Sequence, residues 1–116
     1  MATILIGDDH AAVREMLGIA LGCIHNTRLA ASGAAALEIA RVERIDFALL
    51  DIQLPEMDGP QLLSALRSIN PDMKCCFMSA SYAPAPDEIP HSEVVSYLEK
   101  PFPLEDLMLL ISTQLG

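Results

Sequence analysis

Polar side chains that could act together follow four short apolar runs in this sequence. Asp8 and Asp9 follow TILIG, Asp51 follows FALL, Ser79 follows KCCFM and Lys100 follows VVSYLE. Three carboxylates in one place repel each other, since two unit charges about 4 Å apart cost about 4 kcal/mol near a protein surface. A hard divalent cation such as Mg²⁺ relieves that repulsion. Beside such an ion a carboxylate can attack a phosphoryl group, while an ammonium and a hydroxyl stabilise the charge on its oxygens.

These residues meet only if the apolar runs before them are strands of one parallel sheet. The runs are short and bounded by turn residues, which is typical of strands buried on both faces. Five candidate strands cover residues 3–6, 27–31, 47–51, 74–79 and 94–98. In open α/β sheets, ligands bind outside the carboxyl ends of the strands. We therefore expect the acid pair, Asp51, Ser79 and Lys100 to converge at that edge.

Helical patterns separate the candidate strands. They cover residues 10–24, 34–44, 60–69 and 104–115, with Pro60 at or just before a first helical turn, where proline is tolerated. The expected core-facing residues are Val13, Met16, Leu17, Ala20, Leu21 and Ile24, then Ala34, Leu37, Ala40 and Ile45, and last Leu104, Leu107, Met108, Leu110, Ile111 and Leu115. Three prolines within residues 84–90 predict an irregular loop over residues 80–92, with at most a short helix near 87–93. The repeated β-α order predicts an α/β fold, a doubly wound parallel five-stranded sheet.

Composition limits the class of protein. The 116 residues suffice for one domain, and with no linker or repeat we expect a single unit over 1–116 without a separate output domain. The net charge of −9 argues against direct nucleic-acid binding. No apolar run approaches about 18 residues, so we expect no membrane span, and the N-terminus does not resemble a signal peptide.

The cysteines and histidines do not suggest a zinc site. The three cysteines, Cys23, Cys75 and Cys76, are odd in number and lack Cys-x-x-Cys spacing, which favours free thiols in a reducing compartment. The three histidines are scattered and do not complete a four-ligand set. His10, directly after the acid pair, is expected to face solvent in the first helical turn.

The order and spacing of these segments resemble the receiver domain of response regulators in two-component signalling, over essentially the whole chain. The matching segments are Asp8-Asp9 after ILIG, LLDIQLPEMDG around Asp51, Ser79 in FMSA, and Lys100-Pro101 in SYLEKPF. The resemblance implies a (βα)5 fold with flavodoxin-like strand order 2-1-3-4-5 and a cytoplasmic signalling domain. It implies no enzyme beyond self-catalysed phosphotransfer and autodephosphorylation.

The resemblance also implies roles for the residues of the acid cluster. Asp51 would accept a phosphoryl group from a histidine kinase or a histidine phosphotransfer protein. Asp9, Asp51 and the backbone carbonyl of Gln53 would hold Mg²⁺, or Mn²⁺ in its place, with Asp8 acting partly through water. Lys100 would pair with the acyl phosphate, and its bond to Pro101 would be cis.

The switching surface is the part where this chain departs from the family pattern. The resemblance implies that Ser79 bonds a phosphate oxygen and that Tyr97 moves with it, although a half-buried packing tyrosine remains an alternative for Tyr97. The family usually has a fourth helix ending in Gly-Ala, whereas this chain reads APAPDEIPHSEVVSYLEK, and Pro103 replaces the expected capping aspartate. The output partner protein and any homodimer would depend on this segment.

Simpler readings and other functions stay open at this point. Asp8 and Asp9 could cap the first helix, Asp58 before Gly59 is typical of a turn, and Glu56 is expected to be exposed. One alternative function is a receiver-like interaction module with impaired switching. A more remote one is a Mg²⁺-dependent aspartyl-phosphate phosphohydrolase, whose haloacid-dehalogenase-like members need a second acid where this chain has Gln53.

Overall fold

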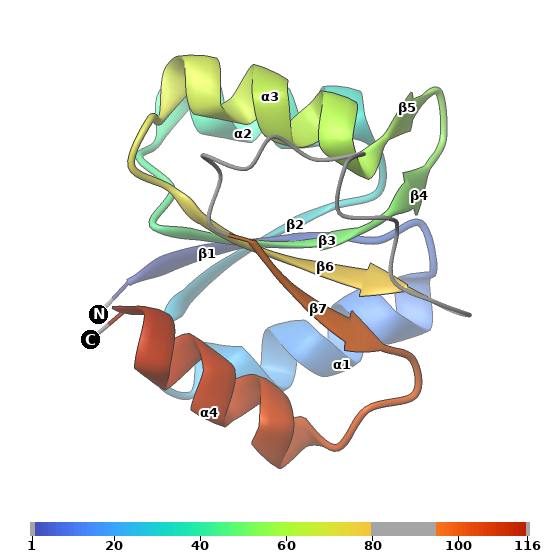
Figure 1. Cartoon of the computed structure of the whole chain (residues 1–116), viewed down its shortest axis with the longest axis vertical. Coiled ribbons are helices and arrows are strands. Elements are labelled where there is room, and N and C mark those ends of the chain that lie inside the picture. Colours follow the sequence, from blue (N-terminus) through green and yellow to red (C-terminus); the bar gives the residue numbers. More distant parts are fainter. Residues whose placement is uncertain (1, 80–94, 116) are drawn as a thin grey trace.

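Five parallel strands form one central sheet in the computed structural model, which describes residues 2–79 and 95–115 (Figure 1). The strands are β1 (Thr3–Gly7), β2 (Asn26–Ala30), β3 (Phe47–Asp51), β6 (Lys74–Ser79) and β7 (Val95–Glu99). Their spatial order is β2-β1-β3-β6-β7. Because β6 and β7 are the fourth and fifth strands of this sheet, the predicted order 2-1-3-4-5 is confirmed. The predicted irregular loop and short fourth helix lie outside the described residues.

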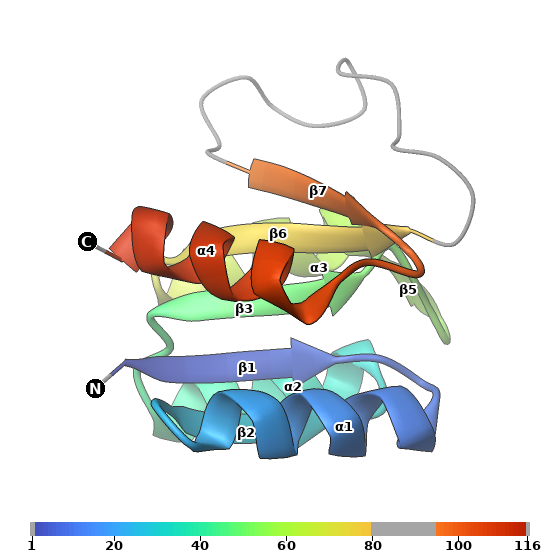
Figure 2. The ribbon, with the colours of Figure 1, turned by 90° about the horizontal axis from the view of Figure 1, so that it is seen from below.

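Helices cover both faces of the sheet. Figure 2 shows α1 (Ala11–Gly22) and α4 (Leu104–Leu115) on one face, and α2 (Gly33–Val42) and α3 (Gly59–Ile69) on the other. Alternate residues of each strand point to opposite faces. Leu50 therefore packs in the cluster under α2 and α3, and Leu49 in the cluster under α1 and α4. Central strand β3 is buried along its whole length, as its apolar run predicts.

Four residues expected in the core are exposed. Met16 is 55% exposed, Ile24 50% and Leu104 41%, and Ala34 is also exposed. In α1 the buried residues are Leu17 and Leu21, and Met16 is rotated about 100° away from Leu17 around the helix. Ile24 lies beyond the end of α1, while Ala34 and Leu104 lie in first turns of their helices. The apolar stripes are thus wider and longer than the surface the sheet covers.

The connection from β3 to α3 contains structure that the sequence did not predict. A two-stranded hairpin forms from β4 (Gln53–Leu54) and β5 (Met57–Asp58), with Glu56 at a φ of 68° in its turn. Asp58 then caps α3 in a reciprocal capping box with Gln61. Gly59 packs so tightly that an added Cβ would lie 2.8 Å from the Phe77 ring and 3.0 Å from the Ile52 backbone. This connection therefore begins α3 directly beside the end of β3.

The three cysteines are free thiols, as the sequence predicts. Cys75 and Cys76 are buried in opposite clusters of the core, and burial raises the pKa of the Cys76 thiol to about 12. Among the described residues, no helix has the length and apolar character that crossing a bilayer requires.

Candidate functional site

The acid pair lies directly after β1. Asp8 is fully buried, and its backbone N–H donates to the carbonyl of Ala30, which extends the pairing of β1 with β2. Asp9 is exposed beside it. Arg14 in the first turn of α1 donates from Nη1 to the Asp8 carbonyl oxygen over 2.8 Å. The turn between β1 and α1 is therefore fixed at both ends, with one carboxylate in the core and one at the surface.

Lys100 joins the acid pair to Asp51. Its Nζ donates to Asp8 Oδ2 at 2.7 Å and to Asp51 Oδ2 at 2.9 Å. The backbone N–H of Lys100 donates to the carbonyl of Ser79, and the bond from Lys100 to Pro101 is cis, as predicted. The other Asp51 oxygen, Oδ1, accepts from the backbone N–H of Gln53 at 2.9 Å. The predicted convergence of the acid pair, Asp51 and Lys100 at the carboxyl edge of the sheet is thus present.

The opposite charges of Asp8, Asp51 and Lys100 stabilise one another. Burial alone would raise the pKa of Asp8, but hydrogen bonds from Lys100 and His10 outweigh burial, and the pKa of Asp8 lies below its usual value. Burial likewise disfavours the charged form of Lys100, yet hydrogen bonds to Asp8 and Asp51 raise its pKa. The described state therefore holds one ammonium between two carboxylates.

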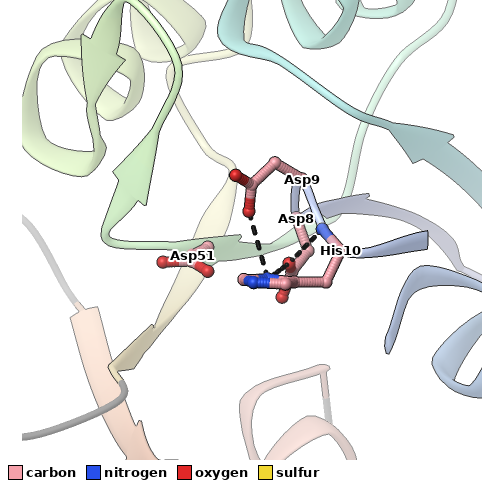
Figure 3. A group of neighbouring side chains, drawn as sticks. All are labelled: Asp8, Asp9, His10 and Asp51. Carbon is pink, nitrogen blue, oxygen red and sulfur yellow. Dashed lines mark hydrogen bonds and ion pairs between the residues drawn. The ribbon is translucent and has the colours of Figure 1, made fainter. Parts of the chain in front are cut away.

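His10 is the residue at this site whose contacts sequence reasoning missed. Its side chain is 66% exposed, as expected, but Nδ1 lies 2.9 Å from Asp8 Oδ1 and 3.1 Å from Asp9 Oδ1 (Figure 3). The hydrogen bond to Asp8 and the charge of Asp9 raise the pKa of His10. Asp8, Asp9, His10 and Asp51 each offer one ligand atom, all within 4.8 Å of one another. The only feature of the sequence that pointed to these contacts was the position of His10 directly after the acid pair.

Ser79 and Tyr97 lie on the neighbouring strands. Ser79 ends β6 and is buried, one residue beyond Met78, which pairs with Asp51 across the sheet. Tyr97 is half-buried in β7, and its ring centroid lies 5.8 Å from that of Phe77. This ring contact gives Tyr97 a packing role in the described state.

Comparison with known proteins places the chain in a family. The model of the response regulator receiver domain matches residues 4–112, and the chain belongs to that family. It is 34% identical over 110 residues to the probable transcriptional regulatory protein TcrX of Mycobacterium tuberculosis, covering 92% of this chain and 47% of that protein. It is 38% identical over 119 residues to sensor kinase CckA of Brucella abortus, covering 98% of this chain and 12% of that protein. The chain spans about half or less of the length of these relatives.

Solved structures agree with this assignment. Chemotaxis protein CheY4 of Vibrio cholerae superposes with a TM-score of 0.88 at 26% identity, covering 97% of this chain and 98% of that one. The receiver domain of hybrid histidine kinase CckA gives a TM-score of 0.83 at 28% identity, with 98% and 99% covered. Receiver domains are two-component signalling modules that accept a phosphoryl group on an aspartate, bind Mg²⁺ at an acidic pocket, and interact with histidine kinases and phosphotransfer proteins.

Proposed function

We propose that Asp51 is the phospho-acceptor of this receiver domain. The supporting observation is the position of its carboxylate at the end of the central strand, bonded to Lys100 and grouped with Asp8 and Asp9. A histidine kinase or a histidine phosphotransfer protein supplies the phosphoryl group. One Asp51 oxygen attacks the phosphorus, the phosphorus–nitrogen bond of the donor phosphohistidine breaks, and its electron pair leaves on the imidazole.

The donor set at this edge suits Mg²⁺, and Mn²⁺ can replace it. Asp9, Asp51 and the backbone carbonyl of Gln53 would hold the ion, and Asp8 would act partly through water. When bound, the ion would supply positive charge against the phosphoryl oxygens. Lys100, whose Nζ lies 2.9 Å from Asp51 Oδ2, is close enough to pair with the phosphoryl group once it is attached. The Lys100 ammonium, with the metal when it is bound, would thus offset the charge that transfer brings to Asp51.

The switch that follows involves Ser79 and Tyr97. Phosphorylation adds about −1.5 to −2 charges and strong acceptor oxygens. Ser79, at the end of the strand next to Asp51, donates to one of these oxygens, and Tyr97 shifts with it. Because Ser79 makes this bond only when Asp51 is phosphorylated, phosphorylation shifts the equilibrium between two conformations of the surface around β7 and α4. A partner protein reads that surface. We assign residues 1–116 to one receiver unit that works in the cytoplasm.

Labelling with a small phosphoryl donor tests the assignment. Wild type is incubated with acetyl phosphate and Mg²⁺, beside Asp51→Asn and the control Asp58→Asn, since asparagine also caps helices well. We expect Asp51→Asn to lose labelling, Asp58→Asn to keep it, and circular dichroism to be the same for all three. Undiminished labelling of Asp51→Asn refutes the assignment.

The same samples separate the two alternative functions. Rapid turnover of a phosphomonoester would identify a phosphohydrolase instead. Fluoroberyllate that leaves the chemical shifts of Ser79 and Tyr97 unmoved would identify an interaction module that does not switch.

A further inference from the structure

His10 brings a nitrogen donor to a cluster that otherwise offers carboxylate oxygens. Figure 3 shows its imidazole ring directed towards the carboxylates, with Nδ1 bonded to both members of the acid pair. Because the side chain is 66% exposed, packing does not force the ring into this position. The two carboxylates hold it there, and the proposed function gives it no role.

The spacing of the donor atoms is close to what an octahedral ion requires. Ligands about 2.1 Å from an ion lie about 3.0 Å apart when adjacent and about 4.2 Å apart when opposite. The 3.1 Å from His10 Nδ1 to Oδ1 of Asp9, which the proposed function assigns as a direct ligand, is close to the spacing of adjacent positions. The ligand atoms of Asp9, His10 and Asp51 lie within 4.8 Å of one another, so a contraction of at most about 0.6 Å would fit these three around one ion.

The kind of donor atom decides which metal ions bind more tightly. Carboxylates and water suit Mg²⁺ and Mn²⁺, whereas imidazole suits later transition metals, which bind nitrogen more strongly. In the described contacts Nδ1 carries a proton and donates it to the carboxylates, so a metal ion must displace that proton. Nδ1 then presents its lone pair while Nε2 keeps the remaining ring proton. A site with one imidazole therefore differs in its choice of metal from a site with carboxylates alone.

We infer that His10 Nδ1 is an additional ligand that raises the affinity of this site for transition-metal ions such as Co²⁺ relative to Mg²⁺. The inference rests on the proposed function, because it uses the carboxylates assigned there to the metal. It extends that function because the choice of metal would then also depend on His10, to which the proposed function gives no role.

Titration calorimetry with Co²⁺ and Mg²⁺ at one pH tests the inference. His10→Gln removes the imidazole but keeps a hydrogen-bonding side chain. His25→Gln is the matched control, since His25 accepts from the backbone of Ala2 beside the opposite end of β1. All samples carry Cys23→Ser, so that the exposed thiol contributes nothing. We expect the ratio of Co²⁺ to Mg²⁺ affinity to fall about tenfold or more in His10→Gln, and to stay unchanged in His25→Gln.

A spectroscopic readout identifies the ligand directly. Co²⁺-loaded protein should show a contact-shifted exchangeable imidazole N–H resonance in proton NMR, which His10→Gln removes. An unchanged affinity ratio in His10→Gln, or a resonance that persists in it, overturns the inference. Equal thermal unfolding of the metal-free proteins excludes a folding defect.

Failure of the proposed function can be distinguished from failure of the inference about His10. Mg²⁺ binding and Asp51 labelling of the protein with His10 intact test that function alone. If Mg²⁺ binding and Asp51 labelling fail while the Co²⁺ signal still depends on His10, the proposed function is wrong but His10 is a metal ligand. If Mg²⁺ binding and labelling succeed while the Co²⁺ signal does not depend on His10, only the inference about His10 is wrong.

Discussion

Replacing Lys100 with methionine tests whether its ammonium offsets the repulsion between Asp8 and Asp51. Nζ makes hydrogen bonds of 2.7 and 2.9 Å to these two carboxylates. A hydrogen bond to a charged group contributes about 1.5–3 kcal/mol. Because the Lys100 side chain is 19% exposed, water can replace part of each bond, and the lower figure applies. Two such bonds give an expected loss of about 3 kcal/mol.

Metal-free thermal unfolding followed by circular dichroism measures this loss. For a domain of this size we expect the midpoint to fall by about 12 °C. Lys74→Met, at the opposite end of the sheet, is the control for removing a lysine. In an Asp8→Asn background the loss should drop by about half, because one of the two charged partners is gone. A Lys100→Met variant no less stable than Lys74→Met would refute the electrostatic account of this edge.

Two further predictions concern pH and packing. Because the pKa of Asp8 lies below its ordinary value of 3.8, the Asp8 carboxylate contributes fully to stability above pH 3.8, and that contribution is lost as the pH falls further. The unfolding midpoint of Asp8→Asn should therefore fall less steeply than that of the wild type between about pH 4 and pH 2. Equal slopes for the two proteins would contradict this. Gly59→Ala should destabilise by about 1–3 kcal/mol in urea unfolding, because its Cβ would lie 2.8 Å from the Phe77 ring. Gly22→Ala, whose Cβ would meet only Thr27 at 3.7 Å, should cost nothing, and equal losses at the two glycines would contradict the packing argument.

The strands could be predicted because each depends on a short pattern of apolar residues. The meeting of their ends then followed from the parallel arrangement of the strands. An apolar run such as residues 47–50 has few alternatives to a buried strand, and parallel strands bring Asp8, Asp51 and Lys100 to one edge. The roles of Ser79 and Tyr97 in switching stay predictions, since they concern a phosphorylated state.

The errors have a physical origin in how much of each helix the sheet covers. Periodicity marks every apolar residue near one face, but Met16 lies at the margin of the buried stripe and Ile24 beyond the end of α1. The β4–β5 hairpin has two residues per strand, too few for a period to be visible. The bonds of His10 depend on the side-chain conformation in the turn after β1, which spacing along the chain does not determine.

The contacts of Lys100 join parts of the chain that are far apart in sequence. Its partners Asp8 and Asp51 are 92 and 49 residues away. Closing the long intervening loops costs entropy, and a fold that depends on contacts of such long range folds more slowly than one built from local contacts. During synthesis Asp51 emerges well before Lys100, so the cluster stays incomplete until β7 has joined the sheet. The chemistry of this edge is therefore tied to completion of the whole fold, and an unfinished chain does not assemble it.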